Sequence, residues 1–366
     1  MRAVTVVLYG ASGYTGRLVA GELHRRGIEH VLSGRDRAKL EPVGAEHGTP
    51  VRAARLDDEA GLRDLLADAS AVINCAGPFT LAGDALVRAA IDTGTHYADS
   101  TGEQGFVQMV FERHGAAAER AGVALLPSIG FDFLPGDCIA RLAAEGHEPL
   151  EELVIAYDVE GFGMSRGTLR SALEAMQSGG VIYDGGDWRP APGGIFRASF
   201  DFPEPLGRQT MSRYPSAEVI TVPRHTRTQR VVSMLTARTV VPIPVVSELT
   251  PYLQPGLELA MRTPLRGLLQ EGVGLLPEGP PEDERRATAW TIVADAHGDD
   301  GRTSRTVARG VDVYGITAVI LTHAATLLSA PGFDRAGALG PAAAFDPVAF
   351  LNFLGDHGVS WERRGP

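Results

Sequence analysis

Residues 4–16 read Val4-Thr5-Val6-Val7-Leu8-Tyr9 and then Gly10-Ala11-Ser12-Gly13-Tyr14-Thr15-Gly16. The apolar, β-branched run predicts a strand, and apolar residues at helical spacing between Arg17 and Leu23 predict a helix after the glycines. Such a turn lets backbone N–H groups at a helix N-terminus approach a dinucleotide pyrophosphate. The stretch therefore predicts a strand, a phosphate-binding loop and a helix at the start of a nucleotide-binding unit.

The three glycines have separate expected roles. Gly10 permits the sharp turn, Gly13 lets the backbone approach the phosphates, and Gly16 lets the helix pack on the strand. Their spacing, G-x-x-G-x-x-G, is a variant of the usual G-x-G-x-x-G. The alternative is a glycine-rich turn without a ligand. The predicted cofactor contacts in this loop are Gly10, Ala11, Ser12, Gly13, Tyr14 and Thr15.

The segment after the second expected strand, 29–33, bears on the choice of cofactor. An Asp or Glu at its end would favour NAD, because it binds the ribose 2′-hydroxyl. This chain instead has Ser33-Gly34-Arg35 there. A planar guanidinium suits a 2′-phosphate, so Ser33, Gly34 and Arg35 favour NADP(H). The alternative is that Arg35 is a solvated charge at the start of a helix.

Two later strands are expected to border the rest of the cofactor. Asp57 follows the expected strand 51–56 and is placed near the adenine, although Asp57 or Asp58 equally fits the N-cap of the helix 59–66. The expected strand 70–74 leads into small residues that let ribose and nicotinamide pass close to backbone. These predicted contacts are Cys75, Ala76, Gly77 and Pro78.

Polar groups at the carboxyl ends of the fifth and sixth expected strands, 96–99 and 123–127, face the ligand crevice of a parallel sheet. The further cofactor contacts predicted there are Ser100, Thr101, Gly102 and Phe131. Candidate groups for proton transfer or ribose binding in the same loops are Tyr97, Glu103 and Asp132. Strand and helix alternate about six times over this half, which predicts a doubly wound, parallel α/β domain.

Composition restricts the other function classes. The 366 residues suggest two domains, and the formal net charge of −11 argues against general nucleic-acid binding. The two cysteines make neither a disulfide framework nor a cysteine-based metal site, and no histidine pair has metal-ligand spacing, so no metal is expected. The apolar segment 311–328 contains Asp312 and His323 and predicts a buried helix, not a membrane span. A cytoplasmic protein is expected.

The second half predicts a mostly antiparallel sheet. Expected strands cover 153–159, 218–222, 230–235, 287–297 and 302–308, and a helix starts at Arg166. Glycine and proline dominate 179–194, which predicts a flexible or lid-like loop. The apolar helical stretch 252–276 is suited to packing in the core, to lining an apolar pocket or to forming a dimer contact. A homodimer is therefore a further expectation. Tyr157 and Arg166 are the catalytic candidates of this half.

Four motifs resemble saccharopine dehydrogenase-like oxidoreductases, nearest the subgroup of bacterial trans-acting enoyl reductases. They are Gly10 to Gly16, Asn74 to Phe79, Thr95 to Glu103 and Gly130 to Asp137. The resemblance covers 1–140 and implies an NADP-binding Rossmann domain followed by an α+β substrate domain. The expected division is 1–140 for the Rossmann domain, 141–320 for a substrate or dimerisation domain, and 321–366 for a helix and tail that return to the first domain.

The expected activity is an NADPH-dependent reductase that transfers hydride to a polarised C=C, C=N or C=O bond of a small or lipid-like substrate. An enoyl reductase-like reaction is preferred, because residues 151–200 offer few basic side chains for a substrate with several carboxylates. The alternatives are a saccharopine-type imine reductase or dehydrogenase acting on an amino acid, and a non-catalytic NADP(H)-binding sensor.

Overall fold

The computed structural model describes residues 5–365, except for 179, 193–197, 241–251, 253–255, 257–262 and 264. The described chain forms two units. The first contains residues up to 132 together with 314–340, and the second contains 133–313 together with 341 onward. The structure thus sets the boundaries at 132, 313 and 340, and the last 50 residues are divided between the two units.

The first unit is built on a parallel sheet. Its strands are β1 (Val6–Tyr9), β2 (His30–Gly34), β3 (Val51–Ala53), β4 (Ala71–Asn74), β5 (His96–Asp99), β6 (Ala124–Leu126) and β15 (Gly337–Ala338). Its helices are α1 (Tyr14–Arg25), α2 (Arg37–His47), α3 (Glu59–Leu66), α4 (Phe79–Thr93), α5 (Gln104–Met109), the π-helical turn η1 (Val110–His114), α6 (Gly115–Ala121) and α15 (Val313–Leu328).

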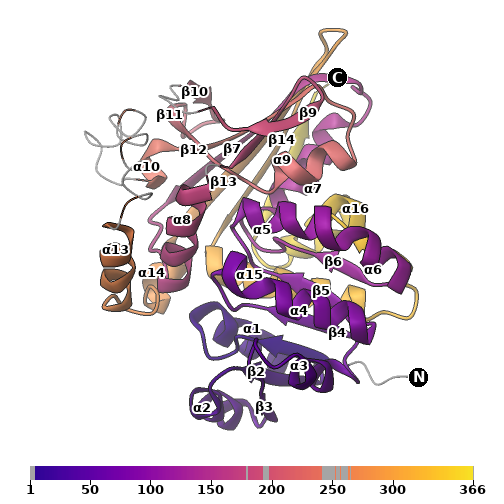
Figure 1. Ribbon diagram of the computed structural model, residues 1–366. Coiled ribbons are helices and arrows are strands. Elements are labelled where there is room, and N and C mark those ends of the chain that lie inside the picture. Colours follow the sequence, from indigo (N-terminus) through magenta and orange to yellow (C-terminus); the bar gives the residue numbers. More distant parts are fainter. Residues whose placement is uncertain are drawn as a thin grey trace. The chain divides into compact units, whose positions relative to one another are not determined.

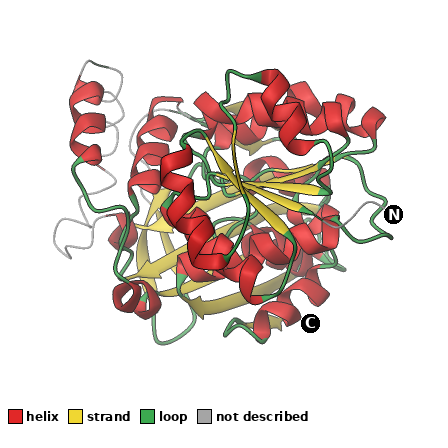
Figure 2. Ribbon diagram, turned by 90° about the horizontal axis from the view of Figure 1, so that it is seen from below, coloured by secondary structure: helices red, strands yellow, loops and turns green. Residues whose placement is uncertain are grey.

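The seven strands described for this sheet follow the order β15-β6-β5-β4-β1-β2-β3, and every neighbouring pair is parallel. β1 lies between β2 and β4. The strand order therefore runs from β1 to β2 and β3 on one side, and reverses to β4, β5 and β6 on the other side. Such a reversal leaves a crevice at the carboxyl ends of the strands, where α/β proteins bind ligands. Figure 2 shows the twisted strands as a fan with helices on both sides. The predicted Rossmann architecture is confirmed.

A late segment completes this sheet. β15 pairs with β6 through Gly337 opposite Ala124, and Tyr314 of α15 packs edge-on against Tyr14 of α1 at 5.0 Å between ring centroids. In Figure 1 these orange and yellow segments lie among the violet elements of the first unit. None of the described helices is long and apolar enough to span a membrane.

The second unit is built on a mixed sheet. Its strands are β7 (Leu150–Glu160), β8 (Val181–Asp184), β9 (Asp187–Pro190), β10 (Ala198–Asp201), β11 (Arg208–Arg213), β12 (Arg230–Thr236), β13 (Ala289–Gly298), β14 (Thr303–Val311) and β16 (Ser360–Arg364). Its helices are α7 (Leu134–Ala144), α8 (Arg166–Ser178), α9 (Glu218–Thr221), the 3-10 turn η2 (Val222–Arg224), α10 (Ala237–Val240), α13 (Leu265–Gly274), α14 (Glu282–Ala287), α16 (Pro341–Ala344) and α17 (Pro347–Gly355).

The described strands of this second sheet are mostly antiparallel, as predicted, whereas β7 and β12 are parallel neighbours. Its main path runs β10-β11-β12-β7-β13-β14-β16. Arg305 of β14 donates to the Asp201 carbonyl of β10 at 3.0 Å and lies over the Phe200 ring. Because β14 and β10 are far apart in the strand order, this contact shows that the sheet curls. The concave face holds an apolar core that includes Met211 and Val293, and α7 packs across β13 and β14.

Two predictions for this half are wrong. The expected strand 218–222 is the short helix α9 followed by η2, because its buried residues pack helically against α7 instead of joining the sheet. The expected loop between 179 and 194 contains the hairpin of β8 and β9, closed by a turn at Gly185 and Gly186. Much of the predicted apolar stretch 252–276 lies outside the described residues, and its described part contains α13.

Candidate functional site

The glycine loop is held between the ends of β2 and β4. The N–H groups of Gly10 and Ala11 both donate to the Ser33 carbonyl, at 2.8 and 3.1 Å. Gly10 has a φ of +83°, and a Cβ there would lie 2.8 Å from the Ala76 nitrogen and from the Cys75 carbonyl carbon. Because both contacts are with backbone, only glycine fits this position.

The start of α1 is left without a side-chain cap. Gly13 is its N-cap and is exposed, whereas Asp36 and Asp58 cap α2 and α3 through bonds of 3.1 and 2.9 Å to backbone N–H groups. A Cβ at Gly16 would lie 2.1 Å from the Gly10 carbonyl oxygen, so glycine is needed for the helix to start against the loop. Helix N–H groups in this state suit a phosphate. Ser12, Tyr14 and Thr15 beside them are partly exposed.

Arg35, directly after β2, is exposed and has no ion pair or side-chain hydrogen bond among the described residues. Of its basic neighbours, Arg37 pairs with Glu41 at 2.9 Å and Arg55 with Asp57 at 2.8 Å, whereas Lys39 has a loose ion pair with Asp36 at 3.9 Å. The Asp57 carboxylate accepts two hydrogen bonds from Arg55, which lower its pKa. Arg35 is thus an arginine at this edge whose guanidinium keeps its donors for a ligand.

Two other predicted contacts make bonds within the protein. The Ser33 hydroxyl is buried and donates to the Arg52 carbonyl at 2.6 Å, so its side chain faces β3. The Gly34 carbonyl accepts the Ala54 N–H at 3.0 Å. Asp58, not Asp57, caps α3.

The loop after β4 is arranged by Asn74. Its side-chain oxygen accepts the Ala76 N–H at 3.0 Å, and its amide nitrogen donates to the Tyr97 hydroxyl at 3.1 Å. Burial raises the pKa of the Cys75 thiol to about 12, so Cys75 is not a thiolate nucleophile at neutral pH. Gly77 is exposed and Pro78 precedes α4.

Glu103 joins the loops after β4 and β5. Its buried carboxylate accepts the N–H of Phe79 at 2.8 Å and the N–H and hydroxyl of Thr80 at 2.7 and 2.5 Å, so it caps α4. Its own N–H donates to the Thr101 hydroxyl at 3.0 Å. Ser100 and Gly102 are partly exposed between these anchors.

Asp99 joins the loops after β5 and β6. One carboxylate oxygen accepts the N–H groups of Thr101 and Ser128, at 2.9 and 2.8 Å, and burial raises the pKa of Asp99 to about 7.

Tyr97 is buried in the core of the first unit, where burial raises the pKa of its hydroxyl well above the usual value. The Phe131 N–H donates to the Thr317 hydroxyl at 3.0 Å, and Asp132, the last residue of this part of the first unit, is half-buried.

The second unit contains a buried acid–phenol pair. The Tyr157 hydroxyl donates to Oε1 of Glu218 on α9, and both groups lie directly over Gly136 of α7. A Cβ at Gly136 would lie 2.1 Å from the hydroxyl and 2.3 Å from the carboxyl oxygen. Burial raises the pKa of Glu218 to about 8, and the nearby Asp137 charge adds to this, so Glu218 holds a proton at neutral pH.

A second carboxyl in the same cluster stays ionised. Asp137 accepts the Thr221 hydroxyl at 2.6 Å and the Ala342 N–H at 2.7 Å, and lies 3.1 Å from His225 Nε2. These partners lower its pKa, led by His225, even though burial opposes them. Two carboxyls whose pKa values move in opposite directions are typical of acid–base sites. Sequence reasoning missed both Glu218 and His225. Of these residues, only Asp137 could have been found from the sequence, because it is the last residue of the motif Gly130 to Asp137.

Arg166, the first residue of α8, pairs with Glu278 at 2.9 Å and donates to the Gly274 carbonyl at 3.2 Å. The helix start itself is capped by Ser165, whose hydroxyl accepts the Thr168 N–H at 3.1 Å. The five catalytic candidates are therefore divided: Tyr97, Glu103 and Asp132 belong to the first unit, and Tyr157 and Arg166 to the second.

Residues 6–126 match the family described as the saccharopine dehydrogenase NADP binding domain. These residues form a saccharopine dehydrogenase NADP-binding domain. The resemblance predicted from the motifs is confirmed, and the family implies an NAD(P) cofactor. The glycine cradle and the uncapped start of α1 fit the dinucleotide that such a domain binds.

Relatives of the chain carry reductase and lipid-related names. A Bos taurus protein named "saccharopine dehydrogenase-like oxidoreductase" is 29% identical over 196 residues, which cover 47% of this chain and 46% of that protein. A Caenorhabditis elegans "lipid droplet localized protein" is 31% identical over 37% and 35% of the two chains. A Mycobacterium tuberculosis "putative trans-acting enoyl reductase" is 32% identical over 48% and 45%. The chain thus spans about half or less of each relative's length.

Similarity beyond the NADP-binding domain is seen in the fold. The apo saccharopine dehydrogenase (L-Glu forming) of Saccharomyces cerevisiae matches with a TM-score of 0.64 at 14% identity, covering 99% of this chain and 100% of that chain. The two-unit architecture, with a parallel sheet and a mostly antiparallel one, is therefore the saccharopine dehydrogenase fold.

Proposed function

We propose that this chain is an NADPH-dependent reductase that adds hydride to a polarised C=C, C=N or C=O bond of a small or lipid-like acceptor. An enoyl reductase-like reaction on a conjugated C=C bond is preferred. The observation that carries the proposal is the exposed Arg35, without an ionic partner among the described residues, beside the glycine loop of a saccharopine dehydrogenase NADP-binding domain.

The preference for NADP(H) over NAD(H) rests on charge. A 2′-phosphate needs donors that are not already bound, and the guanidinium of Arg35 meets that need with paired N–H groups. Ser33 and Gly34 contribute backbone that positions this edge. An acid that would accept a free 2′-hydroxyl is missing at the end of β2, where Ser33-Gly34-Arg35 stands.

When bound, NADPH supplies the hydride. The chain's own residues bind the phosphates at Gly10 to Thr15 and border the nicotinamide with the loops that Asn74, Asp99 and Glu103 hold together. A reduction also needs a proton on the second atom of the acceptor bond. We propose Tyr157 as the donor. Its hydroxyl gives up the proton, and Glu218, protonated at neutral pH, returns one to the phenolate.

The acceptor is proposed to carry little charge. A substrate with several carboxylates needs several unengaged basic side chains. In the second unit, Arg166 is already paired with Glu278 at 2.9 Å, and Arg238 with Asp158 at 2.6 Å. The names of the nematode and mycobacterial relatives, a lipid droplet protein and an enoyl reductase, agree with a lipid-like acceptor.

The test is NADPH oxidation by the purified chain with a panel of enoyl thioesters, enones, imines and ketones, alongside NADPH and NADH binding. Turnover of conjugated enoyl acceptors at the fastest rate is the expected result. Preferred turnover of an imine formed from a dicarboxylic amino acid would instead identify a saccharopine-type enzyme. Tight NADPH binding without turnover of any class would identify a sensor.

A further inference from the structure

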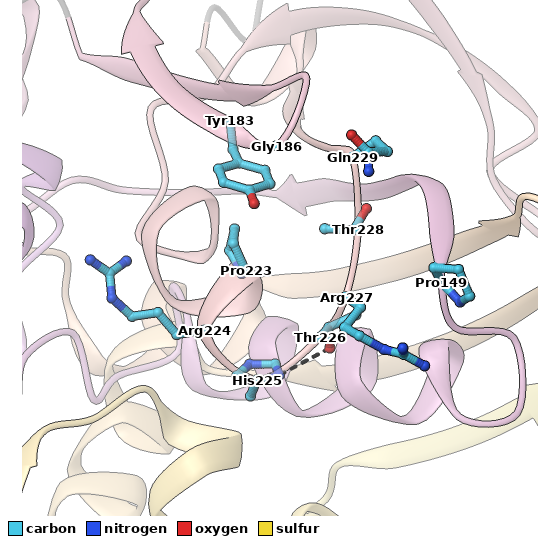
Figure 3. Close-up of a pocket in the computed structure, with 10 residues that line it drawn as sticks. All are labelled: Pro149, Tyr183, Gly186, Pro223, Arg224, His225, Thr226, Arg227, Thr228 and Gln229. Carbon is cyan, nitrogen blue, oxygen red and sulfur yellow. Dashed lines mark hydrogen bonds between the residues drawn. The ribbon is translucent and has the colours of Figure 1, made fainter.

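The second unit has a polar pocket separate from the Tyr157–Glu218 pair. It lies between the β8–β9 hairpin, the residue before β7, and the segment that connects α9 to β12. Its volume of about 640 Å³ is in the range of small-molecule sites. The lining residues, shown in Figure 3, are Pro149, Tyr183, Gly186, Pro223, Arg224, His225, Thr226, Arg227, Thr228 and Gln229.

The lining has the chemistry of an anion site. It includes two arginines and a histidine, together with hydroxyl and amide groups, and the ten residues contain no Asp or Glu. This is the opposite of the whole chain, whose formal net charge is −11. An apolar ligand is disfavoured, because most of the side chains around the pocket are polar.

Arg227 is the side chain best placed to bind an anion. Its side chain is 75% exposed, and its Nε lies 3.7 Å from Glu148, too far for a hydrogen bond. Glu148 is in turn bonded by Arg141. Among the described residues, Arg227 therefore has only this loose ion pair, and its guanidinium keeps its N–H donors.

The other two basic groups are held in place. Arg224 lies over the Trp188 ring at 4.4 Å and donates to the Ile220 carbonyl. Figure 3 shows Arg224 and Arg227 extending in opposite directions from the shared segment, with the bond between His225 and Thr226 below them. Because His225 Nε2 is directed at Asp137, its Nδ1 faces the Thr226 hydroxyl at 3.1 Å. These groups add positive charge or donors to a rigid wall.

We propose that this pocket binds a small organic anion through a carboxylate or phosphate group, with Arg227 as the main ligand-binding side chain. Both groups offer the paired oxygens that a guanidinium binds through two parallel hydrogen bonds. The site lies wholly within the second unit, and the proposal is independent of the hydride acceptor.

The test is titration of the purified full chain with citrate and with inorganic phosphate at constant ionic strength, followed by calorimetry and thermal unfolding. Saturable binding of either anion is expected, and the tighter one identifies the group that is recognised. Arg227→Gln should weaken binding at least about tenfold, the scale of a lost charged hydrogen bond. NADPH affinity should not change, which separates this site from the cofactor site.

Arg230→Gln is the matched control. Arg230 pairs with Glu152 at 2.9 Å and lies next to the pocket without lining it. It should leave anion binding unchanged. Equal weakening by both substitutions, or an equal effect of chloride, would show an adventitious ion only and overturn the proposal. Failure of both anions to saturate would also overturn it. Circular dichroism of each variant confirms that it is folded.

Discussion

Replacing Glu218 by Gln should remove a pH-dependent loss of stability from the second unit. Glu218 is fully buried, its Oε2 has no hydrogen-bond partner within the described structure, and burial raises its pKa from 4.5 to about 8. The folded state therefore keeps a proton that the unfolded state loses near pH 4.5. The free energy of unfolding must fall as pH rises from about 4.5 to about 8, and stay level above that range.

The size of the effect follows from the pKa values. The difference between 8 and 4.5 is 3.5, and at about 1.36 kcal/mol for each unit this gives about 5 kcal/mol as an upper bound. Asp137 acts in the opposite sense but in another range. Its pKa is lowered, so the stability that it contributes is lost only in acid, below its ordinary pKa. Gln keeps the acceptor for Tyr157 but cannot ionise.

The assay is urea unfolding at several pH values between 5 and 9, followed by tryptophan fluorescence. All three tryptophans, Trp188, Trp290 and Trp361, lie in the second unit, so the signal reports on that unit. The stability difference between Glu218→Gln and wild type should be smallest at pH 5, at about 1 kcal/mol, and grow by at least about 2 kcal/mol by pH 8. The pH-dependent contribution of Asp99 to stability cancels in this difference, because both proteins retain Asp99. Glu151→Gln, an exposed change in the same unit, is the control. A difference that stays constant with pH would refute the reasoning.

Three further predictions, the first with a control variant, concern the cofactor site, the proton donor and the stability of the glycine loop. Arg35→Ala should weaken NADP(H) binding by about 1–3 kcal/mol with little effect on NAD(H) binding. The control Arg37→Ala, which removes a residue paired with Glu41, should change neither affinity. Equal losses of affinity for both cofactors would refute the assignment of Arg35 to the 2′-phosphate. Tyr157→Phe should lower kcat at least about 100-fold with unchanged NADPH affinity, and a variant that keeps wild-type kcat would exclude Tyr157 as the donor. Gly10→Ala should cost at least about 2 kcal/mol in the first unit, because its Cβ meets backbone at 2.8 Å and its φ is +83°; thermal unfolding measures this loss, and an unchanged midpoint would contradict it.

The parallel sheet could be predicted because its signals are local. The run from Val6 to Tyr9, the glycines after it and the repeated strand–helix alternation all indicate the same architecture, and the motif in 10–16 placed the loop where the structure has it. The segment 218–222 shows the limit of such reasoning. Its β-branched residues favour a strand, but tertiary packing against α7 makes it helical.

The buried cluster of the second unit could not be predicted because it depends on distant contacts. Tyr157 and Glu218 are 61 residues apart, and Asp137 and His225 are 88 residues apart. Hydrogen bonds between such positions follow from how α7, α9 and β7 pack, which no spacing in the sequence records. Glu103 shows the same limit in the first unit, because its role in capping α4 depends on a contact 24 residues away.

The pairing of β15 with β6 has a consequence for how the protein is made. The nucleotide-binding sheet gains its last strand from Gly337–Ala338, more than 200 residues after β6 ends at Leu126. During synthesis, which proceeds from the N-terminus, β6 remains an open edge while the entire second sheet up to β14 emerges from the ribosome. An exposed edge strand is a template for wrong pairing. The first unit, although its translation starts first, thus cannot be completed until residue 340 has emerged, and the edge of β6 stays open until then.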